Sequence, residues 1–251
     1  MKTIRQWFRK ITEKGYDQVM DWAMGKSAAD WLRKVTKQNI EAQNNLGVRY
    51  ANGEDVTQDY TQAVYWFKLA AKERYTEAQN NLGMCYHNGQ GVAQNYTKAV
   101  NWYRRAAEQG HAKAQNNLGA CYYNGQGVAK NYTKAANWYK KAAEQGHAEA
   151  QNNLGAHYYY GEGTTQDYTK AVYWYRKAVE QGHANAQNSL GVCYYNGQGV
   201  TKNKNYALYW FQKALEKSED LNASLAEPLK NEIRNLKEEG YTAINPEQQS
   251  S

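Results

Sequence analysis

Ala78-Gln79-Asn80-Asn81-Leu82-Gly83 is the stretch that decides the fold, because it recurs along the chain at a constant interval of 36 residues. It returns unchanged at Ala42–Gly47, Ala114–Gly119 and Ala150–Gly155, and it returns at Ala186–Gly191 with Ser189 in place of one asparagine. A fixed period of about 20 to 50 residues is typical of stacked structural repeats. The sequence therefore predicts one elongated array of five repeats, which span Glu41–Thr76, Glu77–Ala112, Lys113–Ala148, Glu149–Ala184 and Asn185–Asp220.

Each repeat is predicted to hold two helices, here called helix A and helix B. In the second repeat helix A runs from about Glu77 to His87, and its apolar residues Ala78, Leu82 and Tyr86 have the spacing of one helical face. A glycine such as Gly83 costs about 1 kcal/mol inside a helix, so its recurrence predicts that another helix crosses closely there. Asn88-Gly89-Gln90-Gly91-Val92 follows as the turn, in which glycines supply positive φ.

Helix B is predicted to begin after an N-cap residue and to end at a glycine. The N-caps are Asp59, Asn95, Asn131 and Asp167, and the closing glycines are Gly110, Gly146 and Gly182. By the same spacing the buried residues of helix B are Ala99, Trp102, Tyr103 and Ala106. The first repeat has Asp55 where other repeats have Gly91, and Arg74 where they have Gly110, so it is predicted to close both turns differently.

The ends of the array are predicted to carry caps, because terminal repeats need a different outer face. Residues 1–40 are expected to form an N-terminal helical cap that includes a degenerate repeat, and residues 221–240 a C-terminal capping helix. That helix is expected from about Pro228, with Leu229, Ile233 and Leu236 on its apolar face. Residues 241–251 are expected to be a disordered tail.

Charge is concentrated at the N-terminus. Of the net charge of +7, residues 1–40 carry +5, so the array is nearly neutral and a nucleic-acid partner is not expected. Residues 3–14 are predicted to form a basic amphipathic helix, which would either lie on an anionic membrane or, as we favour, cover the end of the array. No apolar run is long enough to span a membrane. The sequence as written has no secretory signal, which predicts a cytoplasmic protein, or an exported one if a signal was removed.

Three motifs recur in residues 41–220: Ala-x-x-x-Leu-Gly-x-x-Tyr-x-x-Gly-x-Gly-Val, then Asn/Asp-Tyr-x-x-Ala-x-x-Trp-Tyr, then Ala-Ala-Glu-Gln-Gly. This pattern resembles the Sel-1-like repeat (SLR) family, which is related to the tetratricopeptide repeats. The resemblance implies an all-α fold, a right-handed α/α superhelix or solenoid of five helix pairs with helix A on its concave side. It also implies a scaffold or adaptor role, often in bacteria. The period by itself predicts only a helical array.

The analogy with tetratricopeptide arrays selects three rows of helix A residues for a concave binding face. Asparagine offers both donors and an acceptor to a peptide backbone, and tyrosine adds contact area at a small entropy cost. The first row is Asn44, Asn80, Asn116, Asn152 and Asn188; the second row is Ala51, His87, Tyr123, Tyr159 and Tyr195; the third row is Asn52, Asn88, Asn124, Tyr160 and Asn196.

No metal site or cofactor is expected. Cys85, Cys121, His157 and Cys193 occupy one repeat position, but equivalent positions in packed helices lie about 10 Å apart. Zinc ligands must lie within about 2.3 Å of one ion. These side chains are therefore interpreted as semi-buried and unpaired, which fits a reducing compartment. Cysteine-rich relatives pair two cysteines in each repeat, and this chain lacks the second one.

Catalysis is not expected either. The Asn-Gly-Gln-Gly turns follow a helix and lack the Lys-Ser/Thr of a phosphate-binding loop. His111, His147 and His183 recur after the closing glycines, and no nucleophile or paired carboxylate stands outside the repeat pattern, so they are interpreted as loop residues.

The sequence thus predicts non-catalytic binding of a protein or peptide, without a small-molecule ligand. Three alternatives remain open: an immunity or regulatory protein that blocks one toxin or enzyme, a β-lactamase-like hydrolase, and a designed consensus array. The irregular sequences of the caps argue against design.

Overall fold

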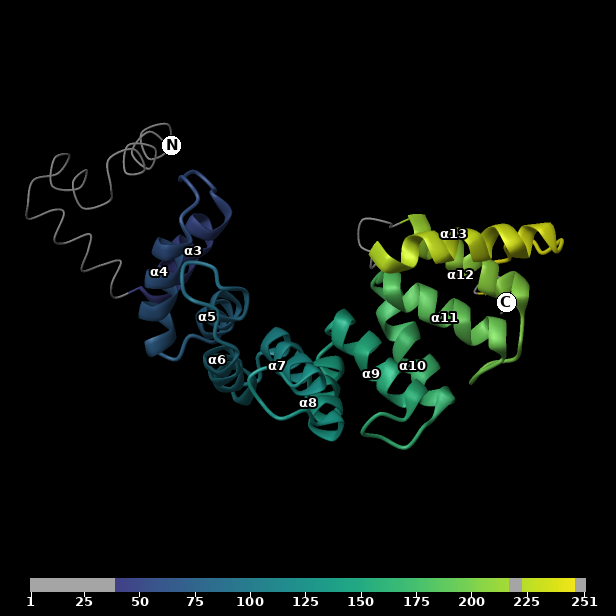
Figure 1. Cartoon of the computed structure of the whole chain (residues 1–251), viewed down its shortest axis with the longest axis horizontal. Coiled ribbons are helices and arrows are strands. Elements are labelled where there is room, and N and C mark those ends of the chain that lie inside the picture. The colour runs from purple at the N-terminus through teal and green to yellow at the C-terminus, as the bar shows by residue number, and fades with distance from the viewer. Residues whose placement is uncertain (1–38, 217–222, 247–251) are drawn as a thin grey trace, which may run out of the picture. The chain divides into compact units, whose positions relative to one another are not determined.

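The computed structural model describes residues 39–216 and 223–246. In this part of the chain the regular structure is helical, with turns and without strands (Figure 1). The A helices are α3 (Ile40–Asn52), α5 (Thr76–Asn88), α7 (Ala112–Asn124), α9 (Ala148–Tyr160) and α11 (Ala184–Asn196). The B helices are α4 (Tyr60–Lys72), α6 (Tyr96–Glu108), α8 (Tyr132–Glu144), α10 (Tyr168–Glu180) and α12 (Lys204–Glu216), and α13 (Ala223–Glu238) follows them.

The prediction of an all-α chain with five helix pairs in tandem is therefore confirmed. The predicted N-terminal cap, with its amphipathic helix at 3–14, lies outside the described residues except for Asn39 and Ile40. Asn39 is the N-cap of α3, and its side chain accepts a hydrogen bond from the backbone N–H of Ala42 at 3.0 Å.

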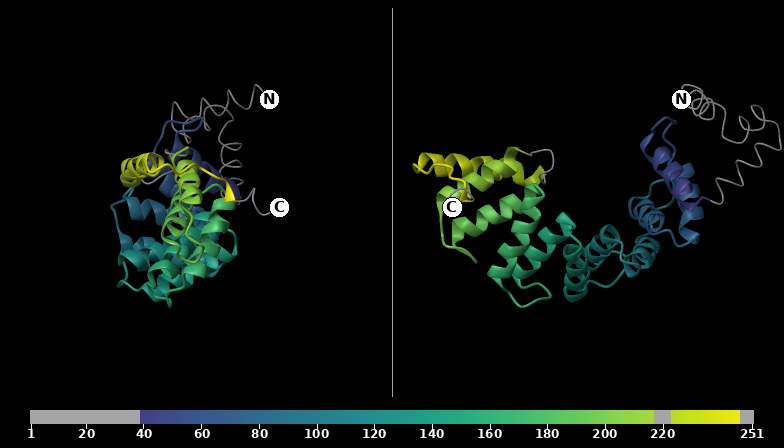
Figure 2. Two further views of the ribbon diagram at one scale, coloured as in Figure 1. Left: turned by 90° about the vertical axis from the view of Figure 1, so that its right-hand side faces the viewer. Right: turned by 180° about the vertical axis from the view of Figure 1, so that it is seen from behind.

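The chain divides into two compact units. The first contains the residues up to Ala114 together with Gly125–Ala129, and the second contains Gln115–Asn124 together with the residues from Lys130 onward. In the first unit α4 packs against α3 and α5, and α5 packs against α6. In the second unit α9 packs against α8 and α10, α11 packs against α10 and α12, and α13 packs against α12 (Figure 2).

Small side chains line the contact between the two helices of a repeat. Ala78 and Leu82 of α5 are fully buried, as are Ala99 and Ala106 of α6, as predicted. The predicted close crossing at Gly83 is also confirmed. A Cβ atom there would lie 2.6 Å from the ring of Tyr103, so only glycine fits without a shift. The same relation holds for Gly119 and Tyr139, at 2.8 Å.

Trp102 differs from its prediction as a buried residue. It is only half-buried, and the guanidinium of Arg105 lies over its ring at 4.5 Å from the centroid. The side chain thus covers the apolar surface of α6 while one ring face meets a cation, an arrangement that is favourable for tryptophan at a partly wet position.

The predicted caps of the B helices are present. Asp59, Asn95, Asn131 and Asp167 are N-caps whose side chains accept hydrogen bonds from backbone N–H groups of the first turn. Gly110, Gly146 and Gly182 follow these helices with φ of +92°, +88° and +73°. The turn after each A helix also contacts the preceding repeat, because a Cβ on Gly91 would lie 2.1 Å from the carbonyl oxygen of Tyr60.

The prediction that the first repeat closes its turns differently is wrong. Asp55 and Arg74 adopt φ of +59° and +65°, the left-handed conformation of the glycines that they replace. For a residue with a side chain this conformation costs roughly 1–2 kcal/mol. The repeat geometry is therefore maintained at these two positions against a local backbone preference.

The C-terminal end departs from prediction in two ways. Helix α13 begins at Ala223, five residues before Pro228, so Pro228 lies inside the helix. Proline removes one backbone hydrogen bond there, and the burial of Leu229, Ile233 and Leu236 against α12 favours the helix nonetheless. Residues 241–246 are not a disordered tail, because the backbone N–H of Thr242 donates to Asn205 Oδ1 at 2.9 Å.

Candidate functional site

The first row of predicted site residues is mostly buried. Asn44, Asn80 and Asn116 are 3%, 0% and 8% exposed, so their prediction as residues that meet a partner is wrong. Their neighbours turn toward them from the following repeat: Asn81 Nδ2 donates to Asn44 Oδ1, and Asn153 Nδ2 donates to Asn116 Oδ1, each at 3.1 Å. These asparagines join consecutive A helices.

The last described link of this kind is broken. Ser189 stands where the other repeats have the donor asparagine, and its hydroxyl donates to the carbonyl oxygen of Asn185 at 2.9 Å. Asn152 Oδ1, which would be the acceptor, is buried without a hydrogen-bond partner. Asn152 and Asn188 are half-buried. The substitution of one residue type thus explains one unsatisfied polar atom.

A second set of buried amides was not predicted. Gln79, Gln115 and Gln151 are buried in the A helices, and their side-chain oxygens accept from Gln109, Gln145 and Gln181 at 2.8, 2.7 and 2.8 Å. Each donor lies at the end of the B helix of the same repeat. The recurrence of one glutamine in the hexapeptide and of another in Ala-Ala-Glu-Gln-Gly is the signal that could have identified this pair.

The three middle residues of the second row each make two contacts that hold them in place. The rings of His87, Tyr123 and Tyr159 pack on the first tyrosine of the following B helix at centroid distances of 5.1, 5.2 and 5.2 Å. Their polar tips reach the turn of the next repeat. His87 Nε2 lies 3.3 Å from Gln126 Oε1, Glu162 lies near the Tyr123 hydroxyl, and Tyr159 donates to Gln198.

The ends of the second row differ from its middle. Ala51 has no polar tip. Tyr195 lies beside Glu232 of α13, and the negative charge of that carboxylate, with burial as a smaller cause, raises the pKa of the tyrosine. Burial and the neighbouring Glu162 likewise raise the pKa of Tyr123. Tyr123 and Tyr195 therefore stay uncharged near neutral pH.

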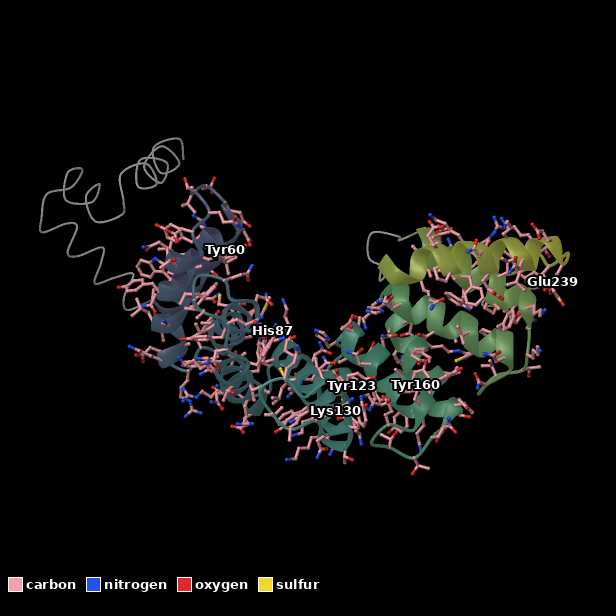
Figure 3. The ribbon with its side chains drawn as sticks, viewed as in Figure 1. Tyr60, His87, Tyr123, Lys130, Tyr160 and Glu239 are labelled. Atoms are coloured by element: carbon pink, nitrogen blue, oxygen red, sulfur yellow. The ribbon has the colours of Figure 1, made fainter. Side chains whose placement is uncertain are left out.

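The third row is exposed in every described repeat, on Asn52, Asn88, Asn124, Tyr160 and Asn196. Tyr160 is 67% exposed, the most of any large apolar or aromatic residue described, and Figure 3 labels it with His87 and Tyr123. We call the second-row and third-row residues of the second unit the helix A face; they are Tyr123, Asn124, Tyr159, Tyr160, Tyr195 and Asn196. It presents amide groups and aromatic rings.

The recurring cysteine position is buried. Burial raises the pKa of Cys85 and Cys121 to about 11 and that of Cys193 to about 12, so these thiols are protonated and unreactive near neutral pH. His157 shares the position and is also buried, and burial lowers its pKa. Among the residues described, no three His, Cys, Asp or Glu side chains come close enough to bind a metal ion.

His111, His147 and His183, which were predicted as loop residues, cap the A helices. Their Nδ1 atoms accept from the backbone N–H groups of Ala114, Ala150 and Ala186 at 3.1 to 3.2 Å. His111 also contacts Glu77 at 3.0 Å, and His183 contacts Glu149 at 2.7 Å. The hydrogen bond from His183 holds the pKa of Glu149 below its ordinary value. These histidines have a structural role that sequence reasoning missed.

Comparison with known proteins gives the same architecture. The family model described as Sel1 repeat matches residues 40–75, 76–111, 112–147, 148–183 and 184–218, each starting one residue before the boundary chosen from the sequence. A solved Sel1 repeat protein from Oxalobacter formigenes is 36% identical, with a TM-score of 0.70 over 82% of this chain and 79% of that one.

A second similar structure is a protective antigen of uropathogenic Escherichia coli strains with an SLR fold. It is 34% identical, with a TM-score of 0.70 over 95% of this chain and 53% of that one, so the chain spans about half its length. The chain has no significant match among curated proteins. None of the described helices is long and apolar enough to cross a membrane.

Proposed function

Because the chain belongs to the Sel1 repeat family, whose members act as protein-interaction scaffolds, we propose that it binds a protein or peptide through the helix A face without catalysing a reaction. The observation that carries this proposal is the arrangement of the second and third rows. Fixed aromatic side chains stand next to exposed amides in successive repeats.

Preorganisation favours binding, because side chains that are already ordered lose little entropy when a partner arrives. Tyr123 and Tyr159 are each fixed by a ring contact and a polar contact to the next repeat. The second row therefore provides rigid apolar area, while Asn124 and Asn196 provide exposed amides. An asparagine amide both donates and accepts, so such a surface suits the main chain of an extended peptide.

The proposed surface excludes the first row. Asn44, Asn80 and Asn116 are buried and Asn44 and Asn116 accept hydrogen bonds from the next repeat, so replacing them would weaken the fold along with any binding. A test of function must use exposed residues whose removal leaves these links intact.

Partner capture by matched triple variants tests the proposal. In the first variant Asn124, Tyr160 and Asn196 of the helix A face become alanine. In the control variant Asn101, Asn137 and Tyr173, which are exposed on B helices, become alanine, so that both variants lose two asparagines and one tyrosine. Both proteins are first checked for unchanged helicity and thermal unfolding.

We expect the wild type and the control variant to capture the same proteins from an extract of the source cells. The helix A variant is expected to lose them. Equal capture by all three proteins, or loss in the control variant alone, would show that the helix A face is not the binding surface.

A further inference from the structure

The fourth repeat differs from its neighbours at the exposed end of helix A. Tyr160 stands where the second, third and fifth repeats have asparagine, and Glu162 stands where they have glutamine. Repeats that are copied share their surface, so a shared surface residue by itself says little about binding. Exposed residues that depart from the copied pattern are where one repeat has acquired chemistry of its own.

Other tyrosine rings of this chain make cation–π contacts with lysine ammonium groups. Lysines lie over the rings of Tyr86, Tyr122, Tyr132, Tyr158 and Tyr195, at 4.6 to 5.6 Å from the ring centroids. Tyr160 is the most exposed of the described tyrosines, and its ring contact is an edge contact with Tyr159 at 4.9 Å. Within the described residues, no cation lies over it.

A carboxylate lies at the same place. Glu162 lies near the Tyr123 hydroxyl, and its negative charge, after burial, is a cause of the raised pKa of Tyr123. No Lys or Arg side chain of the described chain is within ion-pair distance of Glu162. Lys130, which Figure 3 labels near Tyr123, lies over the rings of Tyr132 and Tyr123, at 4.6 and 5.9 Å from their centroids. Glu162 follows Tyr160 by two residues, across the C-cap Gly161, so an exposed aromatic ring and a carboxylate occupy the same end of α9.

We propose that Tyr160 and Glu162 form a binding site for an arginine or lysine side chain of the protein partner. The ring attracts the cation through its π face, and the carboxylate accepts charge-assisted hydrogen bonds from it. This inference rests on the proposed function and adds that the partner presents a basic side chain to the fourth repeat. Asn and Gln at the same positions in the neighbouring repeats have no charge with which to bind one.

The test uses three short peptides, acetyl-Gly-Gly-X-Gly-Gly-amide with arginine, lysine or glutamine at X, titrated into the full chain and followed by NMR. The variant carries Tyr160→Asn and Glu162→Gln, which gives the fourth repeat the residues of its neighbours. The variant should fold, because a glutamine is already accepted at this position: Gln198, which is the equivalent of Glu162 in the fifth repeat, accepts a hydrogen bond from Tyr159. The control is Tyr173→Asn, which removes another exposed tyrosine in favour of the residue that the second and third repeats have there.

We expect saturable shifts of the Tyr160 and Glu162 signals with the arginine and lysine peptides, and none with the glutamine peptide. The double variant should bind the arginine peptide about tenfold more weakly, while Tyr173→Asn binds it as the wild type does. Absence of a saturable shift, equal response to glutamine, or undiminished binding by the double variant would overturn the inference.

Partner capture separates this result from that of the proposed function. One outcome is that the double variant still captures the wild-type partners while the triple alanine variant loses them. In that case the proposed site for a basic side chain is wrong, and the proposed binding through the helix A face is retained. If the triple alanine variant captures them as the wild type does, the proposed function itself fails.

Discussion

Replacing Ser189 with asparagine is expected to raise the stability of the second unit. The substitution supplies the donor that Asn152 Oδ1 lacks, in the geometry that Asn153 and Asn116 already show at 3.1 Å. An unsatisfied buried polar group costs roughly 1–3 kcal/mol. The serine loses its bond to the Asn185 carbonyl, which offsets part of the gain. We therefore expect a net increase of about 1 kcal/mol in the free energy of unfolding.

Urea unfolding followed by circular dichroism measures this change, and a double-mutant cycle with Asn152→Ala assigns it to the pair. In the Asn152→Ala background the new asparagine has no acceptor, so Ser189→Asn should give no stabilisation there. The coupling energy between positions 152 and 189 should be about 1 kcal/mol. A Ser189→Asn variant that is no more stable than the wild type, or a coupling energy near zero, would refute the interpretation of the asparagine links.

Three further predictions concern single positions. His157→Cys, which restores the residue of the other repeats, should flatten the pH dependence of unfolding. The folded state lowers the pKa of His157, so the unfolded chain binds the proton more readily. As the pH decreases below about 6.5, the free energy of unfolding of the wild type therefore decreases, by at most about 1.4 kcal/mol per pH unit. Unfolding midpoints measured at several pH values would show this difference. Gly119→Ala should destabilise by roughly 1–3 kcal/mol despite its better helix propensity, because the new Cβ lies 2.8 Å from the Tyr139 ring; thermal unfolding would show a lower midpoint. Arg74→Gly should stabilise by about 1 kcal/mol by relieving a φ of +65°, and an unchanged urea midpoint would contradict this.

Much of the fold could be predicted from the sequence because its determinants are local and repeated. The 36-residue step, the N-cap at Asn95 and the glycine at position 83 each follow from the requirements of one helix or one crossing. Five copies of the same pattern also reduce the chance that any single assignment is accidental. The helices and the close crossing were accordingly predicted correctly.

The binding rows were harder to predict, because neighbouring asparagines are chemically identical and point in different directions. Each residue of a helix is rotated by about 100° from the one before it, so an analogy that is misplaced by one residue exchanges buried for exposed positions. Asn80 is buried, whereas Asn81 is half-buried and bonds the preceding repeat. Packing between repeats decides which of the two amides is used internally, and composition does not contain that information.

The last repeat shows how such links are maintained where the array ends. Lys204 replaces the tyrosine that begins the other B helices, and its ammonium lies 5.3 Å from the ring centroid of Tyr195 and 4.9 Å from that of Tyr241. The same ammonium pairs with Glu239 at 2.6 Å.

In the second and fourth repeats the polar atom of the second-row side chain reaches the turn of the next repeat, and after the fifth repeat that turn is absent. Tyr195 instead contacts Glu232 of α13, and Lys204 joins the α12 end to the residues after α13. At this end of the array the neighbours of Tyr195 are the charged side chains of Lys204 and Glu232. Since exposed ion pairs contribute little by themselves, the burial of Leu229, Ile233 and Leu236 must supply most of the free energy that holds α13 in place.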